Sequence, residues 1–196
     1  MAAFADQLDL RIAIAENVGR DDLSDLMPRF IQQAEARLNQ SVRHSSQITD
    51  TTLTFASGVA TLPADFVEMI HVYDAQNCPM RAGSLSDVEA EGSQYYIYAI
   101  HGSEIRIKGI SGDRDIVYYA KLSTLTASVS ASNWLLASYP DVYEYAVTFE
   151  ASKWIKDADM AQTYKALLED ALGSMRVDND RRRWSNAVVR IQGVTP

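Results

Sequence analysis

Residues 140–177 read PDVYEYAVTFEASKWIKDADMAQTYKALLEDALGSMRV, and this stretch decides the predicted fold. Apolar residues recur at spacings of three and four in both halves, which predicts two long helices at about 140–156 and 158–177. Pro140 suits the first position of a helix, where its missing N–H needs no partner. The C-terminal part of the chain is therefore predicted to be a pair of helices.

Two further helices are predicted at the start of the chain, at about 4–18 and 24–43. Gly19 is expected to end the first helix. In the second, Pro28 fits the first turn, and Ser24 with Asp25 can supply the cap. The apolar side of the first helix is predicted to hold Phe4, Leu8, Leu10, Ile12, Ile14 and Ala15. These segments predict a helical hairpin.

Between the two helical regions the apolar period changes to two. Ser57–Gly58 is a plausible hairpin turn, and Ser84 is expected to cap a short helix at 84–92. The β-rich runs at 95–100, 104–110 and 114–122 predict a small antiparallel meander. Residues 123–133 are rich in Ser, Thr and Ala and are predicted to form a crossing loop.

The predicted fold class is therefore α+β and mostly helical. The N-terminal hairpin and the two long C-terminal helices are expected to form a helical bundle, with an antiparallel β-rich insertion at about 48–122. Residues 1–180 form the predicted body, and residues 181–196 form a C-terminal arm. At 196 residues, with 47% hydrophobic and 22% charged residues, the chain fits one globular body with a packed core.

Targeting and redox signals are few. The sequence lacks an apolar run of membrane-spanning length and a basic segment before an apolar stretch at its start, so neither a membrane span nor a signal peptide is expected. Cys78 is the single cysteine, which excludes an intrachain disulfide and a cysteine-built zinc site and fits a reducing cytosol.

Charge is distributed unevenly along the chain. The net charge of -8 disfavours nonspecific binding to duplex DNA, which depends on Lys and Arg replacing counterions. Residues 176–196 hold five arginines against two aspartates, a net charge of +3, which leaves -11 for residues 1–175. An acidic body is thus followed by a basic tail.

Catalytic patterns are not found in the sequence. The three histidines, His44, His71 and His101, do not have metal-ligand spacing, and the common hydrolase and phosphate-binding motifs are missing. His44 is interpreted as a helix-end cation that complements the helix dipole. The acidic pairs Asp21–Asp22 and Asp157/Asp159 lie at helix junctions and are interpreted as caps. We expect no enzyme activity, catalytic residue, cofactor or metal; an uncharacterised hydrolase is the remaining enzymatic alternative.

The run RRRW at 181–184 is the unusual chemical feature of the sequence. Arg and Trp are enriched at interface hot spots, which favours a docking element. A solvated helix end that complements the helix dipole is the structural alternative. A DNA-binding accessory protein that uses Arg181, Arg182 and Arg183 is the functional alternative.

Several segments, in their order and spacing, resemble the adaptor or head-to-tail connector family of tailed phages and gene transfer agents. The resemblance runs nearly end to end and rests on VGRDDL at 18–23, MPRFIQQAEARLNQSVRH at 27–44, TLPADFVEMIHV at 61–72, NWLLASYPDVYEYAVTFEAS at 133–152 and DRRRWSNAVVRI at 180–191. One departure is KGISGDRD at 108–115, where many relatives have a proline-rich segment. We therefore expect this loop to have a different shape.

The resemblance implies a structural virion protein that forms a ring between portal and tail, in the neck of the particle, after assembly in the host cytoplasm. The implied partners are further copies of the chain, with twelve expected in the ring, the portal protein and a downstream tail or stopper protein. Genomic DNA is expected to pass through the lumen without specific binding, and no membrane is involved. Candidate portal-docking residues are Arg181, Arg182, Arg183, Trp184, Val188, Val189, Arg190 and Ile191. Candidate subunit-interface residues are Trp134, Tyr139, Tyr143 and Tyr145.

Overall fold

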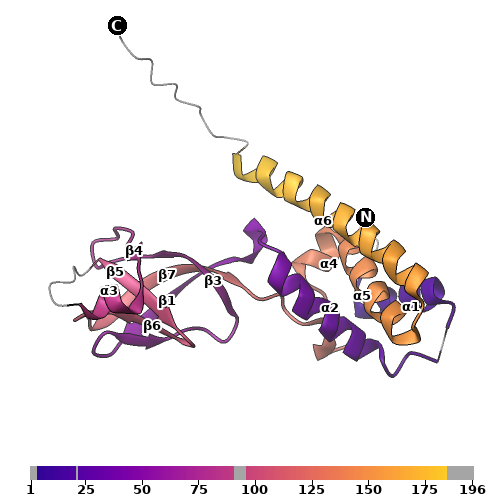
Figure 1. Ribbon diagram of the computed structural model, residues 1–196, viewed down its shortest axis with the longest axis horizontal. Coiled ribbons are helices and arrows are strands. Elements are labelled where there is room, and N and C mark those ends of the chain that lie inside the picture. Colours follow the sequence, from indigo (N-terminus) through magenta and orange to yellow (C-terminus); the bar gives the residue numbers. More distant parts are fainter. Residues whose placement is uncertain (1–3, 21, 91–95, 185–196) are drawn as a thin grey trace, which may run out of the picture. The chain divides into compact units, whose positions relative to one another are not determined.

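The computed structural model describes residues 4–20, 22–90 and 96–184 (Figure 1). About 49% of the chain is helical and 23% is strand, which confirms the mixed α+β class. The chain divides into two compact units. The first, here called the helical unit, comprises residues 1–46 and 122–196, and the second, the β unit, comprises residues 47–121. The β unit covers nearly the range expected for the insertion.

Helix α5 (Pro140–Ile155) is the centre of the helical unit. It packs against α1 (Gln7–Val18), α2 (Met27–Ser41), α4 (Trp134–Ser138) and α6 (Ala158–Trp184). Pro140 occupies its first turn as predicted. The core consists of apolar side chains from all five helices, and its largest fully buried members include Tyr143, Phe30, Leu10, Ile14, Met27, Ile31 and Leu38.

Helices α2 and α6 lie on opposite sides of α5. The ring of Tyr145 packs against Tyr164 of α6, with 6.1 Å between ring centroids. The ring of Trp154 packs against Phe30 of α2, also at 6.1 Å. Trp154 follows Tyr145 by about two and a half helical turns, so the two side chains leave α5 in opposite directions.

The N-terminal helices form, with two differences from the prediction. In α1, Leu10 and Ile14 are buried, whereas Leu8 and Ile12 are about half exposed, because only one stripe of the helix can face the core. Helix α2 begins at Met27 and has no side-chain cap. The expected capping residue Ser24 lies in the preceding turn, where its carbonyl oxygen accepts a hydrogen bond from Arg11. Gly19 ends α1 in the left-handed conformation, as predicted.

Helix α6 is longer than the sequence pattern predicts. It continues past residue 177 and ends at Trp184, so the expected boundary between body and arm falls inside it. The apolar stripe stops near Met175, which hides the continuation from a periodicity argument. Residues 178–184 contain no helix breaker, and an ion pair of 3.0 Å joins Asp178 to Arg182 one turn later.

The predicted crossing loop at 123–133 is bound tightly to the helical unit. It contains a short 3₁₀ turn, Leu125–Ala127, in which Leu125 is fully buried. Its carbonyl groups at Val129 and Ala131 accept hydrogen bonds from the first turn of α1. Asn133 then caps α4, a helix that the sequence reasoning did not predict.

The described residues of the β unit form two small sheets (Figure 1). The first has the order β1-β7-β3, formed by Ile48–Phe55, Gly112–Ala120 and Phe66–Val72. The second has the order β2-β6-β5-β4, formed by Val59–Thr61, Glu104–Ile107, Ile97–His101 and Arg81–Ala82. Helix α3 (Leu85–Glu89) carries a capping box between Ser84 and Asp87, which confirms the predicted cap.

Two predictions about strand pairing are wrong. The three runs after residue 95 do not form one meander, because β7 pairs along its length with β1 and β3 and not with β6. The sheets are also not wholly antiparallel, since β4 pairs in parallel with β5. The predicted turn at Ser57–Gly58 does form, with both residues at positive φ. However, it connects strands that belong to different sheets.

Candidate docking site

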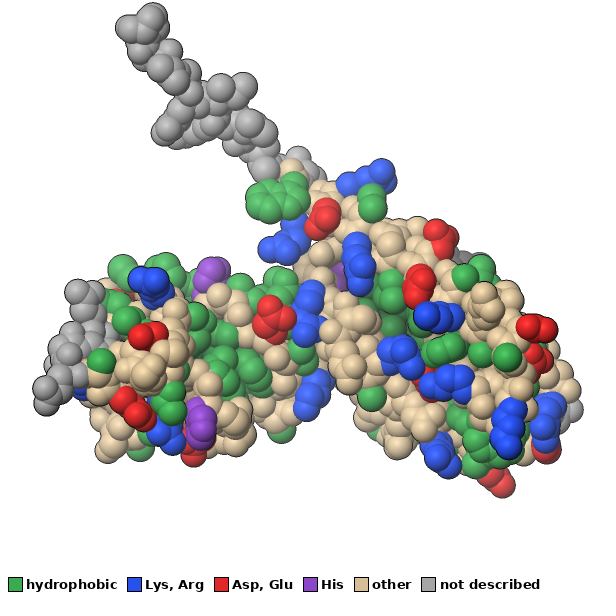
Figure 2. Space-filling model, viewed as in Figure 1, with side chains coloured by type: hydrophobic (Ala, Val, Ile, Leu, Met, Phe, Trp, Pro, Cys, Tyr) green, Lys and Arg blue, Asp and Glu red, His purple; other side chains and the backbone are tan. Residues whose placement is uncertain are grey.

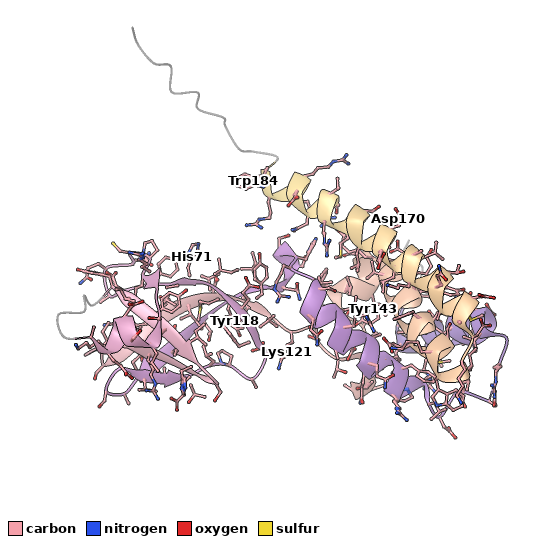
Figure 3. The ribbon with its side chains drawn as sticks, in the orientation of Figure 1. His71, Tyr118, Lys121, Tyr143, Asp170 and Trp184 are labelled. Atoms are coloured by element: carbon pink, nitrogen blue, oxygen red, sulfur yellow. The ribbon has the colours of Figure 1, made fainter. Side chains whose placement is uncertain are left out.

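The end of α6 presents four of the predicted docking residues. Arg181, Arg182, Arg183 and Trp184 are all exposed, and 66% of the Trp184 surface is accessible. Figure 3 shows Trp184 at the last turn of the helix. The other four candidates, Val188, Val189, Arg190 and Ile191, lie outside the described residues.

Asp178 connects this helix end to the start of α5. Its carboxylate accepts a hydrogen bond from the Tyr139 hydroxyl and forms an ion pair with Arg182. Burial and the neighbouring carboxylate raise the pKa of Tyr139 to about 12, so the phenol keeps its proton. The hydrogen bond from Tyr139 in turn lowers the pKa of Asp178. The carboxylate is therefore ionised at neutral pH and holds Arg182 in place.

His44 extends this hydrogen-bond network through its contact with the Tyr139 hydroxyl. Its ring is buried, stacks on Trp134 with 4.8 Å between ring centroids, and accepts a hydrogen bond at Nδ1 from the Ser46 N–H. Its Nε2 lies 3.3 Å from the Tyr139 hydroxyl. Burial and the charge of Arg182 lower the pKa of His44. The interpretation of His44 as a helix-end cation is therefore wrong: it is a buried, neutral ring, because desolvation disfavours its charged form.

Asn179 adds a second connection from α6 to the same segment. Its side-chain oxygen accepts the Ser45 N–H at 2.9 Å, and its amide nitrogen donates to the carbonyl of Arg43 at 3.5 Å. We call the group His44, Trp134, Tyr139, Asp178 and Asn179 the α6 anchor. Because these contacts come from three segments that are distant in sequence, they fix α6 within about one turn of its exposed arginines.

The four predicted subunit-interface residues separate into different environments. Trp134 and Tyr139 are partly buried members of the α6 anchor. Tyr145 is partly buried beside Tyr164, and the pKa values of both phenols are raised, first by burial and then by nearby carboxylates that include Glu144. Tyr143 has no exposed surface, which makes it a core residue (Figure 3).

Tyr143 belongs to a buried polar cluster around Glu35. The Glu35 carboxylate accepts hydrogen bonds from the Leu125 N–H at 2.7 Å, the Thr124 hydroxyl at 2.8 Å and the Tyr143 hydroxyl at 3.3 Å. Burial raises the pKa of Glu35 despite these three donors. The sequence reasoning missed this residue. Its position between Ile31 and Leu38, on the apolar stripe of α2, is the signal that could have found it.

Groups that suggest other chemistry are dispersed. Within the described part of the chain, no cluster of three or more His, Cys, Asp or Glu side chains has the arrangement of a metal site. His71 and His101 lie exposed in β3 and β5, and Cys78 is exposed. Asp157 caps the start of α6, as predicted for this junction, through its bond from the Met160 N–H. In the described ranges, no helix has the length and hydropathy needed to cross a membrane.

The anchored end of α6 thus exposes Arg and Trp side chains, the residue types that are enriched at interface hot spots. The family model described as SU10 adaptor protein matches residues 5–191, so the chain belongs to this family of phage head-to-tail adaptors. It is accordingly a structural component of a phage virion. No curated protein matches the chain.

Proposed function

We propose that this protein forms a homo-oligomeric ring between the portal and the tail of a phage particle and acts without enzymatic activity. The observation that carries the proposal is the family match, which spans almost the whole chain. We expect twelve copies in the ring, a portal protein on one side, and a tail or stopper protein on the other. The ring would occupy the neck of the virion after assembly in the host cytoplasm. Genomic DNA would pass through its lumen, and the net charge of -8 limits nonspecific binding there.

We further propose that the end of α6 and the residues after it bind the portal. The α6 anchor holds the helix up to Asp178 and Asn179, so Arg181, Arg183 and Trp184 are presented from a fixed base. A side chain that is already positioned loses less entropy on binding, which favours affinity. Arginine adds bidentate hydrogen bonds to carboxylates, so an acidic, aromatic-lined portal surface is the expected counterpart.

The test is a pull-down of full-length protein with its portal. Deleting residues 180–196 is expected to leave the body folded and to abolish portal binding. A finer variant, Arg181→Ala with Arg183→Ala and Trp184→Ala, is expected to weaken binding at least about 100-fold, since hot-spot residues each contribute about 2 kcal/mol. The matched control is Arg176→Ala, an exposed arginine on the same helix, which should bind normally.

Retained portal binding by the deletion variant would overturn the docking assignment. DNA binding by the basic tail is tested by a gel-shift titration over a range of salt concentrations. Binding through phosphate contacts would weaken steeply as the salt concentration rises. We expect no DNA binding at physiological salt.

A further inference from the structure

A basic groove runs between α2 and α5. It is open to solvent and is lined by Arg29, Gln33, Ala36, Arg37, Gln40, Glu150, Lys153 and Trp154. Glu35 is the only acidic residue of α2, and it is buried in the core. The exposed side of α2 therefore carries cations and neutral residues alone. Figure 2 shows Lys and Arg side chains gathered over this part of the helical unit.

Glu150 holds two of these cations in place. It is only 3% exposed and forms ion pairs with Arg37, at 3.0 Å, and with Lys153. Both cations also lie 4.9 Å from the ring of Phe149. With Arg29, the groove has three cations against one carboxylate, so it keeps a positive charge. Trp154, 44% exposed, gives the groove an apolar surface.

A second groove, whose lining holds more carboxylates than cations, lies on the outer side of α6. It is lined by Glu169, Asp170, Gly173, Ser174, Val177, Asp178 and Arg181. Three carboxylates and one arginine belong to its lining. Glu169 and Asp178 also form ion pairs with Lys165 and Arg182, which lie outside the lining. The exposed fraction of Val177 is 51%. Figure 3 shows Asp170 on the side of α6 that faces away from α5.

Gly173 makes this acidic groove deeper, although the fold of the single chain does not require a glycine there. A Cβ atom at position 173 would meet no other atom within 4 Å, and the residue does not have a positive φ. Glycine inside a helix destabilises it by about 1 kcal/mol relative to alanine. The missing side chain leaves a hollow beside Val177, which suits the close approach of a bulky side chain from another molecule.

The two grooves lie on opposite sides of the helical unit, because α2 and α6 pack on opposite sides of α5. We propose that the basic groove of one copy binds the acidic groove of the next copy, with Trp154 placed against the hollow at Gly173. A contact between two different, complementary faces is head-to-tail, and its repetition gives a ring when the rotation closes. This inference rests on the proposed function and assigns the surfaces that join the subunits of its ring.

The first test is a charge swap in the full-length protein. Sedimentation measures self-association, and electron microscopy measures ring formation by the protein alone and by the protein mixed with portal. Arg29→Glu with Gln33→Glu reverses the basic groove without breaking the Glu150 ion pairs. Glu169→Lys with Asp170→Lys reverses the acidic groove. Each pair of changes should weaken self-association at least about tenfold. All four changes in one chain should restore self-association to within about threefold of the unmodified protein, because the reversed grooves then again place opposite charges against each other.

The second test fills the hollow. Gly173→Leu should leave the fold at least as stable, since the site is open and leucine favours helix, but it should prevent ring formation. The matched control is Ala166→Leu, an exposed position about two turns earlier on the same side of α6 and outside the groove, which should still form rings.

The outcomes distinguish failure of the groove contact from failure of the proposed function. Rings formed equally well by the charge-reversed and Gly173→Leu variants would overturn the groove contact and leave the adaptor ring standing. Folded variants whose four-change combination fails to restore association would also overturn it. If the unmodified protein forms no ring alone or with portal, both proposals fail. Portal pull-down should be lost in the Trp184 variant but not in a monomeric groove variant.

Discussion

Glu35 connects α2 with the turn at 124–125 and with α5 in the middle of the helical unit. Its carboxylate accepts hydrogen bonds from the turn at 124–125 and from α5, and without it the Leu125 N–H and the Tyr143 hydroxyl would lose an acceptor in the buried interior. An unsatisfied buried donor costs about 1–3 kcal/mol. The polar cluster therefore determines how the segment after the β unit re-enters the helical core.

Replacing Glu35 with Ala is expected to lower the free energy of unfolding by about 3 kcal/mol, as two buried donors, the Leu125 N–H and the Tyr143 hydroxyl, lose this acceptor. Glu35→Gln should cost less than about 1 kcal/mol, because its amide oxygen keeps an acceptor for Leu125 while the Thr124 hydroxyl can turn to accept. Urea unfolding at pH 7 measures both. Equal losses in the two variants would contradict the role assigned to the carboxylate oxygens.

The raised pKa of Glu35 also predicts a pH dependence. Because the folded state holds the proton more tightly than the unfolded state, the contribution of Glu35 is fully present below the unfolded pKa of about 4.3 and declines as pH rises through the folded pKa. Gln does not titrate, so the unfolding free energy of the unmodified protein should fall relative to that of Glu35→Gln as pH rises from about 4.3 through the mildly acidic range. A difference that stays constant over this range would contradict a raised pKa.

Residue-level predictions from the sequence succeeded where the physical cause is local. Gly19, Ser84 and Pro140 act within one turn of their own position, and each was predicted correctly. The predictions for Ser24 and His44 failed, because the turn before α2 uses backbone hydrogen bonds and the histidine is surrounded by residues distant in sequence. The burial of Tyr143 likewise follows from packing that one segment cannot reveal.

At the scale of elements, the α6 anchor makes the last helix a fixed support. Its apolar stripe ends at Met175, and beyond that point polar contacts with the segments around His44 and Tyr139 hold the helix. Helix ends without such contacts open readily. Removing one contact should therefore loosen the end of α6 while leaving its beginning unchanged.

Tyr139→Phe removes the hydroxyl that donates to Asp178 while keeping the aromatic ring against His44. We expect backbone amides at 176–184 to exchange with deuterium at least about tenfold faster, which corresponds to about 1.5 kcal/mol for one hydrogen bond to a charged group. Hydrogen-exchange mass spectrometry measures this. Tyr145→Phe is the control, since its side chain packs near the other end of α6 against Tyr164. Unchanged exchange in Tyr139→Phe would show that the anchor does not depend on the hydroxyl.

The elements themselves were more predictable than their partners. Hydrophobic spacing located α1, α2, α5 and the first part of α6, and turn residues located most strands. Pairing was not predictable, because β7 joins β1 and β3 across long stretches of chain, and a turn at Ser57–Gly58 does not reveal which sheet receives each strand. Within the described residues, α4 was missed because its five residues are too short for a periodic pattern.

At the scale of the whole molecule, the main feature is that the described residues form two separate hydrophobic cores. One is built from the helices, and the other from the two sheets, with Phe55, Val72, Ile105 and Ile116 among its buried members. Among the residues that the structure describes, none belongs to both cores. Stability is therefore expected to divide between the two units.

Ile116→Ala should destabilise the β unit by about 3 kcal/mol, the usual range for removing most of a fully buried isoleucine. Faster hydrogen exchange should be confined to residues 47–121. Ile100→Ala, at a position 42% exposed, is the matched control and should change exchange little. If exchange in α1 and α5 rises as much as in β7, the two units unfold together, and the division proposed here is wrong.

The path of the chain through the β unit has a consequence for how such proteins diversify. The unit begins and ends side by side: the Gln47 side chain donates to the carbonyl of Ala120 at 3.3 Å, and Ile48 is paired with Tyr119. A segment whose two ends meet interrupts its host at one point only, as domain insertions do. The helical unit can thus accept a different module between Ser46 and Leu122 without rerouting its own helices. One scaffold could in this way serve particles whose remaining components differ, by exchanging the module while the helical framework is inherited unchanged.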